Sequence, residues 1–358
     1  MNETTRTRLL LLLLLLGLVG AVGAAWFGQS RVAVNTPWVK PDPAALLDPD
    51  VVGFCRAVQA DLAAGRYAAL DAAATSFQSL KDRFKGGREK LVMFYSSLQA
   101  ADCTDRRYCV EEAPFPARIA ALDAWRDHDP GAAPPLLALA STWMSYAWAG
   151  RHCHGFTDVT YDEWQSFYDR IWTARDSLDA VTTRDDPEYL LLRMAMLRDS
   201  GGTRAEIAEV YNHGHAIAPQ FLSLVSLYAR LLEPGWYGSQ GDLAQLADSV
   251  LRDPGGDDGA MEYATVTLAE AQQVAFPRLF QQTGLSWDRT KAGLAIIDKR
   301  YGLMNFDWNL ICFMAYSAGD GAGARDAYRH FGQNWDYMVW GTPDNFYGNA
   351  LPWILNAR

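Results

Sequence analysis

From Asp48 onward, apolar residues recur at helical spacing, and this pattern constrains the fold more than any other feature of the chain. The alternation of apolar and polar residues that marks β-strands is almost absent. Short connections containing Gly or Pro separate the predicted helices, so consecutive helices should be antiparallel neighbours. The sequence therefore predicts an all-α domain of stacked antiparallel helical hairpins over residues 48–358. The predicted pairs are 48–65 with 67–84, 134–150 with 161–182, and those within 187–216, 219–252, 257–300 and 305–331.

Several helix starts are marked locally. Thr160 can cap a helix that carries Asp162 and Glu163 in its first turn, where acidic residues complement the helix dipole. Thr203 and Glu206 have the spacing of a capping box. The helix that begins after Thr160 is predicted to carry one apolar stripe, made of Trp164, Phe167, Tyr168, Ile171, Trp172 and Leu178.

The hairpins have an approximate period. Pro187, Pro219 and Pro254 lie 32 and 35 residues apart, close to the tetratricopeptide period of about 34 residues. Later spacing is less regular, which indicates a degenerate repeat. Stacked hairpins of this kind leave a concave surface that can bind peptides or proteins.

Three segments carry a family resemblance. They are Tyr146-Ala147-Trp148 followed by Trp164 and Phe167, the Leu-Glu-Pro-Gly-Trp-Tyr-Gly-Ser stretch at 232–239, and the Asn, Gly-Asp, Phe and Trp positions over 305–335. Together they resemble an uncharacterised bacterial family of tetratricopeptide-like proteins, a domain-of-unknown-function family, over residues 60–340. The resemblance implies a fold and no particular activity, and the sequence departs from the family pattern at residues 151–154.

The N-terminus carries a membrane signal. Arg6 and Arg8 precede an unbroken apolar run, Leu9 to Phe27, of 19 residues. This length approaches the thickness of a bilayer, and the preceding arginines predict a cytoplasmic N-terminus. Residues 1–27 are therefore a signal anchor or a signal peptide that is cleaved after Ala24. The remaining chain is expected to face the periplasm from the inner membrane, or to be periplasmic if the signal is cleaved.

Residues 28–47 are predicted to be a linker, because Pro37, Pro41 and Pro43 interrupt any helix. In an exported domain disulfides are permitted. Cys103 and Cys109 bracket a short polar loop and are the preferred candidate pair, whereas Cys55 and Cys312 lie in apolar stretches typical of buried small residues.

Weak candidates for metal ligands are His152, Cys153 and His154, with His213 and His215 elsewhere. Imidazole and thiolate together suit zinc, but the spacing of established zinc motifs is absent, and a solvated loop is the favoured interpretation.

Other chemical motifs have a structural alternative. Ser239 lies between glycines, without the spacing of a nucleophile elbow, so we expect a turn in which Gly238 and Gly241 have positive φ and Ser239 or Asp242 caps the next helix. The acidic pairs Asp185-Asp186 and Asp257-Asp258 are expected at helix starts. No cofactor is predicted.

The C-terminus is rich in aromatic residues that are expected to close the end of the stack, with a binding interface as the alternative. The candidate interface residues are Trp335, Tyr337, Trp340 and Trp353.

The sequence favours a membrane-tethered scaffold without catalysis of its own that binds a protein or peptide. With 42 acidic and 32 basic residues, the chain is not expected to bind nucleic acid. The alternatives are an exported enzyme, with metal assistance through the 152–154 segment as one form of it, and a small-ligand module with a Trp-lined groove.

Overall fold

The computed structural model describes residues 39–99, 102–104, 111–151, 158–271 and 278–357. Within these ranges the chain forms 17 α-helices and no β-strand, which confirms the all-α class. The first half contains α2 (Pro49–Ala63), α3 (Tyr67–Phe77), α4 (Lys90–Gln99), α5 (Phe115–His128), α6 (Ala133–Gly150), α7 (Tyr161–Asp179), α8 (Pro187–Ser200) and α9 (Arg204–Ile217). The second half contains α10 (Leu222–Leu231), α11 (Asp242–Arg252), α12 (Gly256–Ala271), α13 (Leu279–Thr283), α14 (Trp287–Tyr301), α15 (Asn305–Ala318), α16 (Gly321–Phe331), α17 (Tyr337–Trp340) and α18 (Leu351–Asn356).

The local signals for helix starts are confirmed. The Thr160 hydroxyl accepts a hydrogen bond from the Glu163 backbone N–H, and the Glu163 carboxylate accepts one from the Thr160 N–H. Thr203 and Glu206 form the same capping box at α9. Asp186 caps α8 in front of Pro187, and Gly201, at φ 80°, ends that helix. These interactions join residues only a few positions apart, so the sequence alone indicates them.

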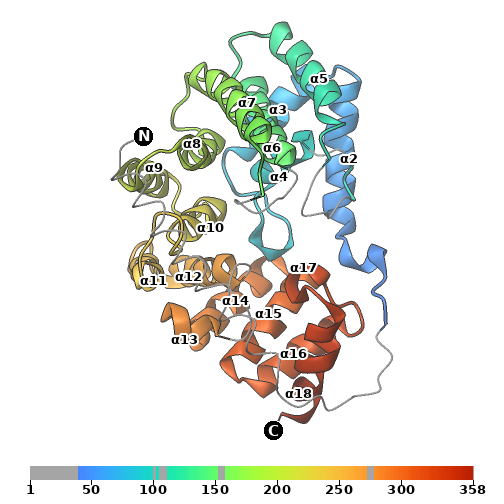
Figure 1. The fold of residues 1–358 in the computed structure, drawn as a ribbon, viewed down its shortest axis with the longest axis vertical. Helices are drawn as coiled ribbons and strands as arrows, with labels where there is room; N and C mark the ends of the chain where they lie inside the picture. The colour runs from blue at the N-terminus through green and yellow to red at the C-terminus, as the bar shows by residue number, and fades with distance from the viewer. Residues whose placement is uncertain (1–38, 100–101, 105–110, 152–157, 272–277, 358) are drawn as a thin grey trace.

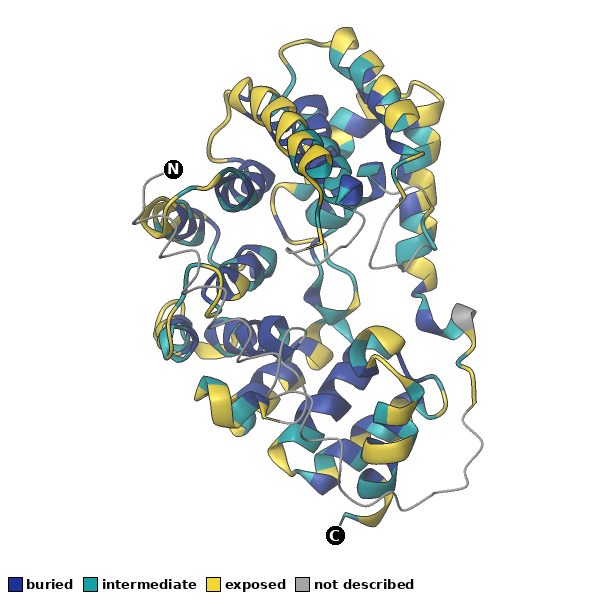
Figure 2. Cartoon of the chain, in the orientation of Figure 1, coloured by how far each residue is buried: buried dark blue, intermediate teal, exposed yellow. Residues whose placement is uncertain are grey.

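The helices follow an arc in Figure 1, from α5–α7 at one end, through α8–α12, to α15–α18 at the other end. α6 packs on α7, α8 on α9, α12 on α14 and α15 on α16. The sequence pattern missed α4 and α5, as well as the short helices α17 and α18. Figure 2 shows that each pair turns its buried side toward its neighbours. Two hydrophobic clusters result, one mostly from α2–α11 and the other mostly from α12–α18.

A loop of residues 80–89, here called the bridging loop, joins the two ends of the arc. It contains the 3₁₀-helix η3 (Lys85–Gly87) and lies inside the arc in Figure 1. Arg83 and Glu89 form a buried ion pair at 2.8 Å, with side chains 3% and 1% exposed. Glu89 also accepts hydrogen bonds from the Leu222 N–H and the Ser223 hydroxyl at the start of α10.

The same loop reaches α14 and α15. Arg88 pairs with Asp307 at 2.7 Å, and the Gly86 N–H donates to the Gly302 carbonyl. The bridging loop therefore occupies part of the inner side of the arc, where the sequence predicted an open concave surface.

The described part of the predicted linker is bound to the C-terminal helices. Residues 39–47 include the 3₁₀-helix η2 (Pro43–Leu46), which contacts α15. Val39 makes three hydrogen bonds there: its carbonyl accepts from the Trp335 indole N–H and the Tyr347 hydroxyl, and its N–H donates to the Tyr347 oxygen. The start of the described chain thus meets its end.

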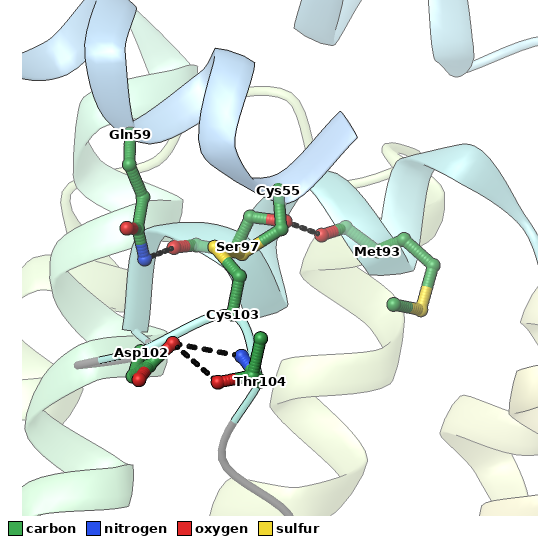
Figure 3. Close-up of a disulfide and its surroundings, with 7 residues drawn as sticks. All are labelled: Cys55, Gln59, Met93, Ser97, Asp102, Cys103 and Thr104. Carbon is green, nitrogen blue, oxygen red and sulfur yellow. Dashed lines mark hydrogen bonds between the residues drawn. A yellow bond between two sulfur atoms is a disulfide. The ribbon is translucent and has the colours of Figure 1, made fainter. Parts of the chain in front are cut away.

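The disulfide prediction is wrong. Cys103 is bonded to Cys55 of α2, and Cys109 lies outside the described residues. Figure 3 shows the bridge where α2 crosses α4, beside a hydrogen bond from the Gln59 amide to the Ser97 carbonyl. The packing of α2 on α4 brings together cysteines 48 residues apart, which sequence spacing cannot indicate. Cys312 is free and buried, as predicted.

The predicted membrane segment lies outside the described residues. Among the helices that are described, none has the length and apolar character needed to span a bilayer.

Candidate interaction surface on helix α7

Helix α7 buries only part of its predicted apolar stripe. Phe167, Ile171 and Leu178 are buried against α6 and α8. Tyr168 and Trp172 are 43% and 45% exposed, and Tyr161, two turns before Tyr168, is 80% exposed. We call Tyr161, Trp164, Tyr168 and Trp172 the aromatic ridge. Single exposed aromatics are common on proteins, but a row along one helix is typical of a binding surface.

The ridge is ordered by contacts among its own rings. Trp164 stacks on Tyr168 with ring centroids 5.8 Å apart. The Arg151 guanidinium lies 4.4 Å from the Trp164 ring centroid and 4.6 Å from that of Trp148. Because these contacts hold the rings in place, a partner would lose little side-chain entropy when it binds there.

Beside the ridge lies an open groove of about 480 Å³, here called the α6–α7 groove. Half-buried Trp143 of α6 forms one wall, and polar residues of α7 form the other. The residues that line it are Trp143, Asp162, Gln165, Ser166, Asp169, Arg170 and Thr173. The groove and the ridge together cover the outward side of α7, which is exposed in Figure 2.

Arg170 is the one basic residue among the described residues that line the groove, and it is directed toward α6 and the segment before α5. The Arg170 guanidinium lies 3.5 Å from the Tyr146 ring centroid and donates to the Tyr146 carbonyl. It also pairs with Glu112 at 2.6 Å. Its charge is therefore neutralised, and the groove retains the exposed carboxylates of Asp162 and Asp169.

A second cavity, of about 760 Å³, lies among the α3–η3, α7–α8 and α9–α10 connections. Asp186 is its most buried acidic residue, and burial raises the pKa of that carboxyl group. The carboxylate accepts hydrogen bonds from the Glu188 and Tyr189 N–H groups and from the Gln78 amide. Asp186 is thus committed to capping α8, in agreement with the structural interpretation of the Asp185-Asp186 pair.

The remaining predicted motifs are structural. His213 pairs with Asp185 and His215 pairs with Glu262, so the two histidines have different partners.

In the turn before α11, Gly241 has positive φ as predicted, but Gly238 does not. A Cβ at Gly238 would lie 1.7 Å from the Leu232 carbonyl oxygen, so this position requires glycine for close backbone approach. Asp257 and Asp258 lie in the first turn of α12 and pair with Arg300.

The metal candidates His152, Cys153 and His154 lie outside the described residues. Over the ranges that the structure does describe, no group of three or more His, Cys, Asp or Glu side chains is arranged to hold a metal ion.

The C-terminal aromatic residues divide between core and surface. Trp335 and Trp340 are buried, and the indole N–H of Trp340 donates to the Asn309 side chain. They fill the second hydrophobic cluster, which agrees with their expected role in closing the end of the stack, and the alternative interface role does not fit these two residues. Trp353 is half-buried against Tyr316, and Tyr337 remains exposed.

In the sequence, the feature that indicates an exposed apolar surface on α7 is the angular width of its apolar stripe. At about 100° per residue the stripe spans about 140°, more than the face of about 100° that a helix usually buries. Trp143, Asp162 and Asp169 had no such signal, because the groove exists only once α6 and α7 pack together.

Comparison with known proteins found no protein-family description, no curated protein and no solved structure that matches this chain.

Several other ionisable groups, two carboxyl groups and one histidine, bind protons more strongly than usual. Burial, together with the neighbouring Glu270, raises the pKa of Glu233 to about 7. Burial also raises the pKa of Glu188 well above its ordinary value. The hydrogen bond to Glu262 raises the pKa of His215. All three groups hold protons in the folded state at pH values where the unfolded chain has lost them.

We therefore expect the free energy of unfolding to fall as pH rises from 5 to 7.5, by about 1–2 kcal/mol from Glu233 alone. The sign follows because the folded state binds more protons over this range, and a tenfold change in ionisation corresponds to about 1.4 kcal/mol. The effect is smaller than the full pKa shift would give, because the Glu233 side chain is only partly buried and solvent screens its charge. Urea denaturation at several pH values measures the effect. Glu233→Gln should flatten the profile, whereas the exposed Glu209→Gln should leave it unchanged; identical profiles for both variants would contradict this assignment.

Proposed function

We propose that this protein is a membrane-tethered interaction protein of tetratricopeptide-like design that acts outside the cytoplasm and binds a protein partner through α7. The observation that carries the proposal is the aromatic ridge. Tyr and Trp are enriched among the few residues that supply most of the binding energy at protein interfaces, because they bury large areas and lose little conformational entropy. The ridge places three such exposed side chains along one helix.

The apolar run at Leu9–Phe27 and the preceding arginines support the tether. Val39, the first described residue, is bound to the C-terminal helices, and α7 lies at the other end of the arc in Figure 1. A tether that joins the domain at residue 39 therefore leaves the α7 surface distant from the point of attachment.

Site-specific photo-crosslinking in intact cells tests this proposal. A photoreactive phenylalanine analogue at position 172 should crosslink to a defined envelope protein, and the crosslinked partner peptide should be identified by mass spectrometry. The matched control places the same analogue at Tyr337, which is also exposed but lies in α17. The crosslink at 172 should be lost when Tyr168 is changed to Ala. A specific crosslink from 337 alone, or none from 172 under any growth condition, would contradict the proposal.

A further inference from the structure

The charges of α7 are unbalanced on the side that faces solvent. The helix contains five acidic residues and two basic residues. Both basic residues are already engaged: Arg170 pairs with Glu112, and Arg175 donates to Asp179 while it lies over the Trp172 ring at 5.3 Å. The carboxylates of Asp162 and Asp169 remain in the groove, where the one bond that Asp169 accepts from a described side chain is a neutral amide hydrogen bond from Gln165.

Aromatic rings elsewhere on α6 and α7 already hold cations from this chain. Arg151 lies between the rings of Trp148 and Trp164, Arg175 covers Trp172, and Arg170 covers Tyr146. The face of an aromatic ring attracts a cation through its quadrupole, by about 0.5–1 kcal/mol at exposed sites. Trp143 lines the groove opposite the α7 carboxylates and offers another ring of this kind.

We propose that the α6–α7 groove receives lysine or arginine side chains from a cationic segment of the partner polypeptide, while apolar residues of that segment pack on the aromatic ridge. This inference rests on the proposed function and adds the chemistry of the partner. Asp162 and Asp169 lie seven residues apart on α7, so each carboxylate pairs with a different cationic group of the segment, and the face of Trp143 attracts such a group as well. An acidic partner would be repelled by the same carboxylates, so the groove selects the sign of the charge.

Isothermal titration of the full-length protein in detergent micelles tests the inference directly. The probes are blocked hexalysine, blocked hexaglutamate and a neutral hexasaccharide, each at low salt and at 150 mM salt. Hexalysine should bind, with lower affinity at higher salt, and the other two probes should not. Tighter binding of the neutral hexasaccharide would overturn the inference in favour of a glycan ligand.

Matched variants separate the groove from the general negative charge of the protein. Asp162→Asn with Asp169→Asn should weaken hexalysine binding about tenfold, because each exposed ion pair contributes up to about 1 kcal/mol. Asp176→Asn removes an exposed charge from the same helix outside the groove and should change the affinity less than twofold. An equal loss in both variants, or no loss in the double variant, would overturn the inference.

The same double variant distinguishes this inference from the proposed function. If the crosslink from position 172 persists at full yield in Asp162→Asn with Asp169→Asn, α7 binds a partner but the groove does not receive its cation. If wild-type protein yields no crosslink while hexalysine still requires the two aspartates, the groove binds cations and the proposed partner on α7 is absent.

Discussion

Arg83→Met should lower the free energy of unfolding by about 3–5 kcal/mol, because it leaves the Glu89 carboxylate buried without its cationic partner. The side chains of this pair are almost fully inaccessible, and Glu89 is also bonded to the first residues of α10. Arg83 in turn donates to the Gln220 carbonyl. Loss of the arginine therefore weakens the contact between the bridging loop and α10 as well as the ion pair.

Chemical denaturation of the purified protein, followed by far-UV circular dichroism, measures this effect. Arg289→Met is the matched control, since Arg289 pairs with Asp248 at 2.7 Å with both side chains more than half exposed. Exposed pairs contribute about 0–1 kcal/mol, so the control should be nearly as stable as wild type. Equal destabilisation of the two variants would show that the bridging loop does not hold the arc together.

Removal of the disulfide between Cys55 and Cys103 should cost about 4 kcal/mol. The bond closes a loop of 48 residues, and the entropy that it removes from the unfolded chain grows with the logarithm of loop length. The shorter loop predicted from sequence, Cys103 to Cys109, would have contributed only about 2 kcal/mol. The size of the effect therefore distinguishes the two pairings.

The measurement compares wild-type protein with Cys55→Ser, each with and without reductant. Reductant should destabilise the wild type and leave Cys55→Ser unchanged. Mass spectrometry of a non-reduced digest should identify a peptide that joins residues 55 and 103. A peptide that joins residues 103 and 109, with Cys55→Ser as stable as wild type, would contradict the pairing.

The features of the fold that could be predicted from sequence depend on residues close together in the chain. Thr160 and Thr203 each bond to a residue three positions away, so their roles were readable from spacing alone. The all-α class follows from the same short-range periodicity. The pairing of Cys55 with Cys103 depends on how α2 packs on α4, and no local pattern encodes that packing.

For the candidate site, too, sequence periodicity indicated the helix but not the contacts that helix packing creates. Periodicity correctly assigned Tyr168 and Trp172 to the apolar side of a helix, but it could not show that this side extends beyond the contact with α6 and α8. Asp162 was predicted as a first-turn acid, which it is, and its place in the groove depends on Trp143, 19 residues earlier in the chain. Sequence reasoning therefore identified the helix, and packing defined the surface.

The three hydrogen bonds of Val39 determine where mechanical load enters the domain. Tension applied to the chain before residue 39 acts first on Trp335 and Tyr347, near the C-terminus, and reaches α2 only after those bonds break. The hydrogen bonds of Val39 are thus the first contacts to break under a pull from the N-terminal side. While they hold, the C-terminal helices bear that force, and α7 at the opposite end of the arc is shielded from it.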